Sequence, residues 1–173
     1  MKALRAVALA QLAFFLAWAG WEEWKVASAP LIILETAPVD PRDLLSGQYV
    51  ALRYSISNLQ LTTGCPKAGT RLNTPIWVHL KPAVTRVVGG MEWKVWTAAE
   101  CSLSRPAVFP VKDLTQGVWV AGIFSDSGVV YGIERYYFSE DRIREMGRIR
   151  TGQMLVEAAV GRNGKLVMKR IIY

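Results

Sequence analysis

An uninterrupted apolar segment opens the chain. Residues 6–21, AVALAQLAFFLAWAGW, carry no charge, and Gln11 is their only polar side chain. The run is slightly shorter than the roughly 20 residues of a membrane-spanning helix and slightly longer than the apolar part of a signal peptide. We therefore expect residues 1–29 to form an N-terminal signal anchor, a single transmembrane helix. A cleaved signal peptide and a buried core helix are the alternatives.

Charges on either side of this segment predict its orientation. Lys2 and Arg5 precede it, whereas Glu22 and Glu23 follow it. Because positively charged flanks stay in the cytoplasm, the rest of the chain is expected on the periplasmic side of the inner (plasma) membrane. The triplet 27–29, ASA, resembles a signal-peptidase site. However, a proline would follow the cut and the charged EEWK separates the triplet from the apolar run, so we expect an uncleaved anchor.

From residue 30 onward, the alternation of apolar and polar positions predicts β-strands. Residues 31–35, LIILE, form a β-branched run between prolines. From Gln48 the period is two, which places Val50, Leu52, Tyr54 and Ile56 on one face and Tyr49, Ala51, Arg53 and Ser55 on the other. Further strands are expected within residues 75–81, 91–98, 118–124, 128–138 and 154–173.

Turn signals join these strands in sequence. Ser125–Gly128 and Asn163-Gly164 both lie between alternating runs, as in β-hairpins. In residues 91–98, Trp93 and Val95 are expected on the strand face opposite Trp96. The pattern predicts one mainly β (β-rich α+β) domain over residues 30–173, an antiparallel barrel or sandwich with short helices.

Two short helices are predicted beside the strands. Asp40 stands before Pro41 as an N-cap, Asp43 falls in the first turn, and Gly47 ends the segment. Residues 139–150, SEDRIREMGRIR, form the second helical pattern. Its arginines are expected either to lie on anionic lipid or to form a solvated face over one end of a barrel.

Composition changes the picture only in part. The chain has 173 residues, seven Trp and a net charge of +7. This balance suits an anionic membrane surface or an acidic partner, and it equally suits a basic soluble surface. A nucleic-acid partner is not expected, because the basic residues are scattered and no recognition motif is present.

Cysteine and histidine content limits the possible sites. Cys65 and Cys101 are the only cysteines, and two cysteines in an exported domain most often pair. Two unrelated buried thiols are the alternative. Their spacing does not suit a metal site, and His79, the single histidine, is predicted on the strand face opposite Val78 and Leu80. No metal or cofactor is therefore expected.

Two motifs resemble those of a known family. Residues 47–54, GQYVALRY, resemble the motif that names the bacterial GDYXXLXY proteins, with matches at Gly47, Tyr49, Leu52 and Tyr54. Gln48 stands where the family carries an acid. The segments 38–44, PVDPRDL, and 131–138, YGIERYYF, are also similar to that family. The resemblance implies a small membrane-anchored extracytoplasmic protein without an assigned activity, of a kind that is similar to partners of multi-spanning membrane proteins.

Catalytic interpretations of these motifs compete with structural ones. Asp40, Asp43 and Glu134 could form a carboxylate cluster for acid–base chemistry or for a hard cation. We expect structural roles instead: Asp40 caps a turn, Asp43 meets a helix dipole, and Glu134 pairs with Arg42 or Arg53.

The tyrosines and serines of the chain offer further candidate sites. Tyr49, Tyr54, Tyr131, Tyr136 and Tyr137 are expected either at the edge of the core, with bonded hydroxyls, or along a ligand groove. A Ser–Lys hydrolase is disfavoured, since PVDP, residues 38–41, occupies the region ahead of Gly47 where a signal peptidase would carry its serine, and no lysine lies in an apolar run. No Gly-x-Ser-x-Gly elbow is present either.

The function that we expect is a non-enzymatic accessory or assembly subunit of a membrane protein complex. Its partners would be the lipid membrane and a multi-spanning integral membrane protein. The alternatives are a hydrolase-like enzyme and a ligand-binding module, both using the acidic cluster of Asp40, Asp43 and Glu134.

Overall fold

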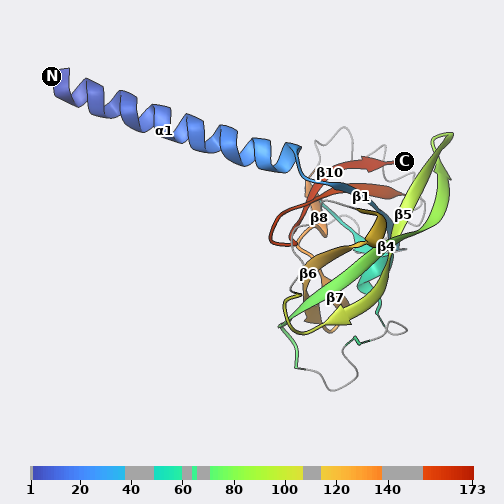
Figure 1. Ribbon diagram of the computed structural model, residues 1–173. Helices are drawn as coiled ribbons and strands as arrows, with labels where there is room; N and C mark the ends of the chain where they lie inside the picture. The colour runs from blue at the N-terminus through green and yellow to red at the C-terminus, as the bar shows by residue number, and fades with distance from the viewer. Residues whose placement is uncertain (1, 38–48, 60–63, 66–70, 107–113, 138–153) are drawn as a thin grey trace.

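The protein consists of one long apolar helix and a curled β-sheet. Figure 1 shows the computed structural model, which describes residues 2–37, 49–59, 64–65, 71–106, 114–137 and 154–173. Helix α1 (Lys2–Ala27) extends away from the sheet and contacts it mainly near β9. Its apolar side chains are exposed all round, and within the described part of the chain it is the one helix long and apolar enough to cross a membrane.

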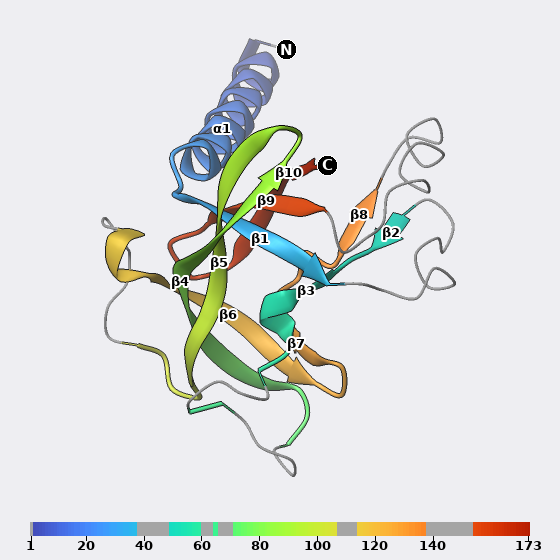
Figure 2. The same cartoon turned by 90° about the vertical axis from the view of Figure 1, so that its right-hand side faces the viewer.

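Most of the β domain is one mixed sheet. Its strands are β1 (Leu31–Ala37), β3 (Arg53–Tyr54), β4 (Thr74–Val88), β5 (Met91–Ser102), β6 (Val118–Ser125), β7 (Gly128–Val130), β9 (Leu155–Val160) and β10 (Leu166–Ile172). The spatial order is β10-β9-β1-β5-β4-β6-β7, and β3 pairs with β1. A separate pair joins β2 (Tyr49–Ala51) to β8 (Arg135–Tyr137). The large sheet curls into a half-barrel (Figure 2).

The prediction of a mainly β fold is confirmed, with one difference in strand direction. Every pairing among the described strands is antiparallel except that between β1 and β5, which is parallel at Ile33 and Val95. A parallel neighbour needs a long connection rather than a tight turn. The chain between β1 and β5 includes β2, β3 and β4, so the alternation of single strands could not reveal this pairing.

The inner face of the half-barrel forms the core. Alternate residues of the strands point into it, as the period-two pattern predicts. Its deeply buried members include Ile32 and Leu34 of β1, Ile76, Val78 and Leu80 of β4, Val118 and Val120 of β6, and Val156 and Ala158 of β9. The hairpin predicted at Asn163-Gly164 joins β9 to β10, and the turn Ser125–Gly128 joins β6 to β7.

One detail of the predicted strands is wrong. The strand expected from Gln48 is divided at Leu52, because β2 pairs with β8 whereas β3 pairs with β1. The chain therefore turns from one sheet to the other, although Leu52, Tyr54 and Ile56 are all buried as expected. Ile56 lies in a short 3-10 helix, η1 (Ser55–Ser57), rather than in the strand.

Trp96 and its neighbour Val95 are both buried. Trp96 belongs to the core cluster together with Ile32 and Leu34, whereas Val95 is outside that cluster and pairs with Ile33 of β1. The two side chains therefore follow the predicted alternation, and Val95 is covered on the other face. A second 3-10 helix, η2, spans Leu114–Gln116. The helices predicted at residues 41–45 and 139–150 lie outside the described residues.

Candidate functional site

The two family-like motifs meet in space. Strand β2 pairs with β8 in the register Tyr49 to Tyr137, Val50 to Tyr136 and Ala51 to Arg135. At the end of this ladder the Leu52 N–H donates a hydrogen bond to the Glu134 carbonyl, with an N–O distance of 2.7 Å. Segments about 80 residues apart in the sequence are thus joined by backbone hydrogen bonds.

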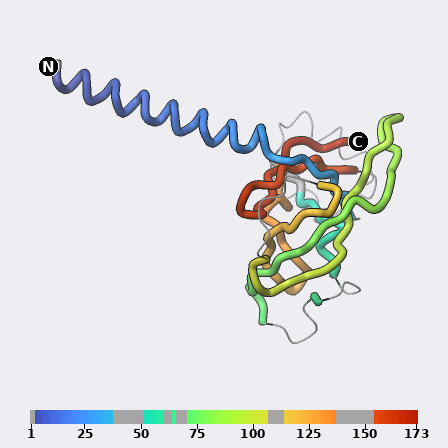
Figure 3. Tube along the Cα trace, in the orientation of Figure 1, coloured from blue at the N-terminus to red at the C-terminus, as the bar shows by residue number. Residues whose placement is uncertain are grey.

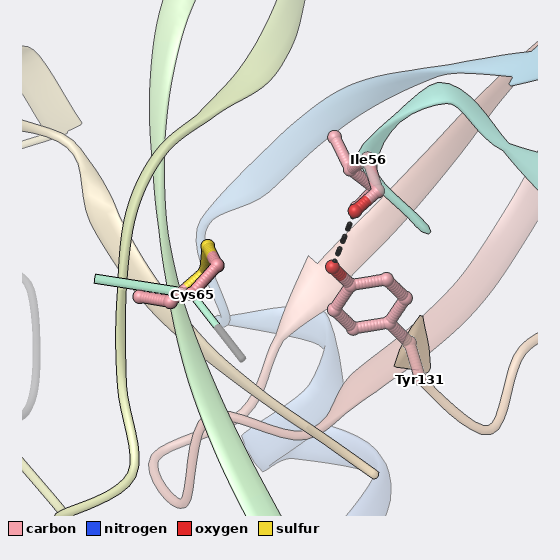
Figure 4. Close-up of a disulfide and its surroundings, with 4 residues drawn as sticks. Ile56, Cys65 and Tyr131 are labelled. Atoms are coloured by element: carbon pink, nitrogen blue, oxygen red, sulfur yellow. Dashed lines mark hydrogen bonds between the residues drawn. A yellow bond between two sulfur atoms is a disulfide. The ribbon is translucent and has the colours of Figure 1, made fainter. Parts of the chain in front are cut away.

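Two motif tyrosines strengthen this junction. The Tyr54 hydroxyl donates to the Ile133 carbonyl over 2.7 Å, and the Tyr131 hydroxyl donates to the Ile56 carbonyl over 2.8 Å. Figure 4 shows the second of these bonds. Each motif therefore supplies a tyrosine whose hydroxyl binds the backbone of the other segment.

Both tyrosines belong to the core. Their rings are almost fully buried, and each hydroxyl is bonded to a carbonyl. Burial, with the Glu134 carboxylate as a smaller cause, raises the pKa of Tyr54 and of Tyr131 far above the ordinary tyrosine value. Both hydroxyls are consequently neutral donors over the whole physiological pH range.

The Glu134 carboxylate binds two backbone N–H groups. Its Oε1 accepts the Tyr131 N–H, and its Oε2 accepts the Gly132 N–H over 2.8 Å. We expected an ion pair with Arg42 or Arg53; Arg42 lies outside the described residues, and among the described side chains no ion pair joins Arg53 to Glu134. The reason is local, because the turn after β7 presents two N–H groups within reach of the carboxylate three residues later.

An open depression lies beside the junction. Its volume is about 520 Å³. The lining residues are Ala51, Leu52, Arg53, Ser127, Val130, Gly132, Glu134 and Arg135. Ser127 carries the only hydroxyl side chain among them, and its oxygen lies 3.2 Å from the Ser125 hydroxyl rather than next to a base. The described residues of this lining include no activated nucleophile, which would need a base in hydrogen-bond reach.

The predicted disulfide is confirmed. Cys65 and Cys101 are bonded, with their Cα atoms 4.7 Å apart (Figure 4). The bond holds the segment before β4 against the end of β5. Gly64, with φ of +73°, lies against the Cys101 carbonyl, where a Cβ atom would come within 2.7 Å of the oxygen.

His79 lies on the outer face of the sheet, as predicted. Its Nδ1 is 2.9 Å from Glu100 Oε1, and its ring stacks on Trp119 at a centroid distance of 4.7 Å. Both partners are its direct cross-strand neighbours, so only the strand register could have revealed them. Within the described residues, no three His, Cys, Asp or Glu side chains gather as metal ligands would.

Several predicted site residues cannot be placed with this group. Asp40, Asp43 and Gly47 lie outside the described residues, so the acidic cluster with Glu134 stays a prediction. Tyr136 is half-buried and packs against the core. The reciprocal bonding of Tyr54 and Tyr131 was not predicted, although their positions on buried strand faces favoured core roles.

An apolar helix followed by a disulfide-bonded β half-barrel, with two motifs that cross-link each other, defines the class of this protein. It belongs to the GDYXXLXY protein family, whose model matches residues 11–171, nearly the whole chain. A search of curated proteins found no significant match, and neither did a search of solved structures.

Proposed function

We propose that this protein is a single-pass, extracytoplasmic accessory or assembly subunit of a membrane protein complex, anchored by α1 in the inner (plasma) membrane. The observation that carries the proposal is the use of the motif groups. The two tyrosine hydroxyls and the Glu134 carboxylate bind backbone groups of the chain itself. Motif residues used in this way build a rigid scaffold and do not offer reactive groups to a substrate.

Helix α1 supports the membrane part of the proposal. At 1.5 Å per residue, its 26 residues extend about 39 Å, enough to cross a hydrocarbon core of about 30 Å. Its exposed apolar side chains, such as Phe15 and Leu16, require an apolar environment. Lys2 and Arg5 favour a cytoplasmic N-terminus, and the disulfide favours an oxidising compartment for the β domain.

Purification with the anchor intact tests the proposal. The full chain, solubilised in mild detergent, is expected to co-purify with a multi-spanning membrane protein at a defined stoichiometry. A matched control replaces residues 1–27 with an unrelated single-pass helix; loss of the partner would place the contact in α1, and retention would place it in the β domain. A full chain that purifies alone from native membranes in every mild detergent would contradict the proposal.

The depression beside Glu134 favours a second candidate, a ligand-binding or hydrolase-like domain. Glu134 lines it together with Arg53 and Arg135. Glu134→Gln separates the two functions. If Glu134 is a scaffold residue, this substitution should remove the acceptor of one backbone N–H and lower the free energy of unfolding by about 1–3 kcal/mol, while any correctly folded fraction keeps its partner. A variant of unchanged stability that had lost a measured ligand or activity would favour the second candidate. Glu92→Gln, on an exposed hairpin, is the control.

A further inference from the structure

One end of the β domain is held next to the end of α1. Only residues 28–30 separate Ala27 from the first residue of β1. They are tied down on both sides: the Ser28 N–H and hydroxyl both bind the Trp24 carbonyl, and the Pro30 carbonyl accepts the Val160 N–H over 2.9 Å. The last turns of α1 also pack near β9. The link formed by residues 28–30, called here the helix–domain junction, therefore holds the domain close to the end of α1.

The length of α1 beyond its apolar run places the helix–domain junction at the membrane surface. The apolar run ends at Trp21, and the six residues to Ala27 extend about 9 Å, close to the 5–8 Å of one headgroup layer. Trp21 and Trp24 are exposed aromatics at the depth of the interfacial belt. Even if residues 28–30 were fully extended, they would add only about 10 Å. The part of the domain beside the junction must then lie against the headgroups.

The β9–β10 turn is on that side of the domain. Figures 1 and 3 show it at the edge of the sheet from which α1 leaves, whereas the β4–β5 hairpin points to the opposite end. The turn is rigid: the Gly164 N–H binds the Gly161 carbonyl over 2.8 Å, and the Gly164 carbonyl accepts the Ala121 N–H over 2.9 Å. It presents Arg162 and Lys165 as exposed cations with no ion-pair partner among the described side chains.

Two exposed apolar residues adjoin these cations. Leu31 of β1 and Val167 of β10 flank Ala159 of β9 on the outer face of the sheet. Leu31 is 46 % exposed and Val167 is 39 % exposed, whereas Ala159 is fully covered. Lys165 precedes Val167 by two residues, the spacing of side chains on one strand face. Leu31, Arg162, Lys165 and Val167 thus form an apolar and basic patch, called here the headgroup patch.

We propose that the headgroup patch rests on the lipid headgroups of the leaflet that α1 leaves, with Arg162 and Lys165 binding lipid phosphates. This rests on the membrane anchoring in the proposed function. Charge complementarity supports it, since lysine and arginine near an anionic leaflet are each favourable. Of the acids near the end of α1, Glu22 is paired with Lys25, and the charge of Glu23 offsets part of the positive charge of the patch. A loop of a partner protein is the competing occupant.

Site-specific fluorescence in the full chain tests this proposal. Both native cysteines are in the disulfide, so Val167→Cys offers a single free thiol for an environment-sensitive dye. Val87→Cys, exposed on the β4–β5 hairpin, is the matched control. Each labelled protein is reconstituted in vesicles of phosphatidylcholine with phosphatidylglycerol that contain a headgroup-attached spin label. We expect strong quenching at position 167 and none at position 87.

Charge variants then test the role of the cations. The double variant Arg162→Gln, Lys165→Gln should shift the equilibrium of the β domain away from the membrane surface. In anionic vesicles the ratio of headgroup-bound to unbound β domain should fall on the order of tenfold, and quenching at position 167 should fall with it. Lys81→Gln with Lys94→Gln removes the same charge elsewhere and should change nothing. Alkaline carbonate extraction tests whether the protein is integrated in the membrane. If the protein resists extraction but positions 167 and 87 are quenched equally, the contact of the headgroup patch with lipid is wrong while the anchoring stands. A protein washed out by carbonate would overturn the anchoring as well. Cross-linking of position 167 to a protein in native membranes, without quenching in pure lipid, would assign the patch to a partner.

Discussion

At the scale of single residues, two buried hydroxyls hold the motifs together. Tyr54 and Tyr131 each satisfy a carbonyl on the other segment, and no polar side-chain atom buried in the described part of the structure lacks a partner. Removing a hydroxyl leaves its carbonyl acceptor buried and unpaired, which is more costly than the hydrogen bond itself.

Tyr54→Phe and Tyr131→Phe should therefore each lower the free energy of unfolding by about 1–3 kcal/mol. The measurement is chemical denaturation of the detergent-solubilised protein followed by tryptophan fluorescence. Tyr173→Phe is the matched control, because Tyr173 is an exposed terminal residue and its loss should change stability by less than about 0.5 kcal/mol. Equal stability of all three variants would contradict the cross-link.

The raised pKa values of Tyr54 and Tyr131 predict a loss of stability at alkaline pH. Their folded-state pKa values lie above the unfolded value of about 10, so the unfolded chain releases these protons first. Stability is then complete below pH ~10 and falls above it, by up to about 1.4 kcal/mol per pH unit for each tyrosine. Denaturation between pH 8 and 11.5 measures this fall, and Tyr131→Phe should make it shallower. A slope that does not differ from that of the unmodified protein would exclude Tyr131 as its cause.

At the scale of elements, close approach of backbones fixes how the β6–β7 hairpin sits on η1. Gly128 has φ of +109°, and a Cβ atom there would lie 2.3 Å from the Ser57 carbonyl oxygen. The β4–β5 turn makes a different demand, since Gly90, with φ of +75°, has nothing within 4 Å of its added Cβ.

Gly128→Ala should accordingly destabilise the fold by about 2–4 kcal/mol, because backbone strain and overpacking act together. Gly90→Ala should cost about 1 kcal/mol, from backbone strain alone. Thermal unfolding of the two variants side by side makes the comparison. A Gly128→Ala variant as stable as Gly90→Ala would show that η1 can move away from the hairpin.

Element positions were predictable from the sequence because alternation is a local property. Ile76, Val78 and Leu80 are buried as their spacing predicts, and the hairpin at Asn163-Gly164 forms where its turn residues indicate. Pairing is not local. The parallel contact of Ile33 with Val95, and the junction of Leu52 with Glu134, depend on how distant strands are brought together, which no single segment determines. The candidate site is made of such long-range contacts, and the binding of the Glu134 carboxylate to the Tyr131 and Gly132 N–H groups was not predicted.

At the scale of the whole molecule, the disulfide favours an oxidising compartment for the half-barrel, and the apolar helix is consistent with that location. Closing the 36-residue separation between Cys65 and Cys101 should stabilise the domain by about 3–4 kcal/mol in the chain-entropy model. That bond is expected only where the domain has left the reducing cytoplasm. In the proposed topology, export would depend on α1, whose flanking charges favour an N-terminus that stays inside.

Topology and oxidation should therefore change together. In the full chain, a periplasmic reporter fused after Tyr173 should be active, a cytoplasmic reporter should be inactive, and both cysteines should resist alkylation until a reductant is added. Replacing Lys2 and Arg5 with glutamate, and Glu22 and Glu23 with lysine, reverses the charge asymmetry and should retain part of the protein inside. The retained fraction should carry free thiols and, without the disulfide, should unfold at lower denaturant concentration.

Free thiols in exported protein would contradict the compartment argument. An active cytoplasmic reporter on the unmodified chain would contradict the orientation of α1 and, with it, the placing of the headgroup patch on the outer leaflet.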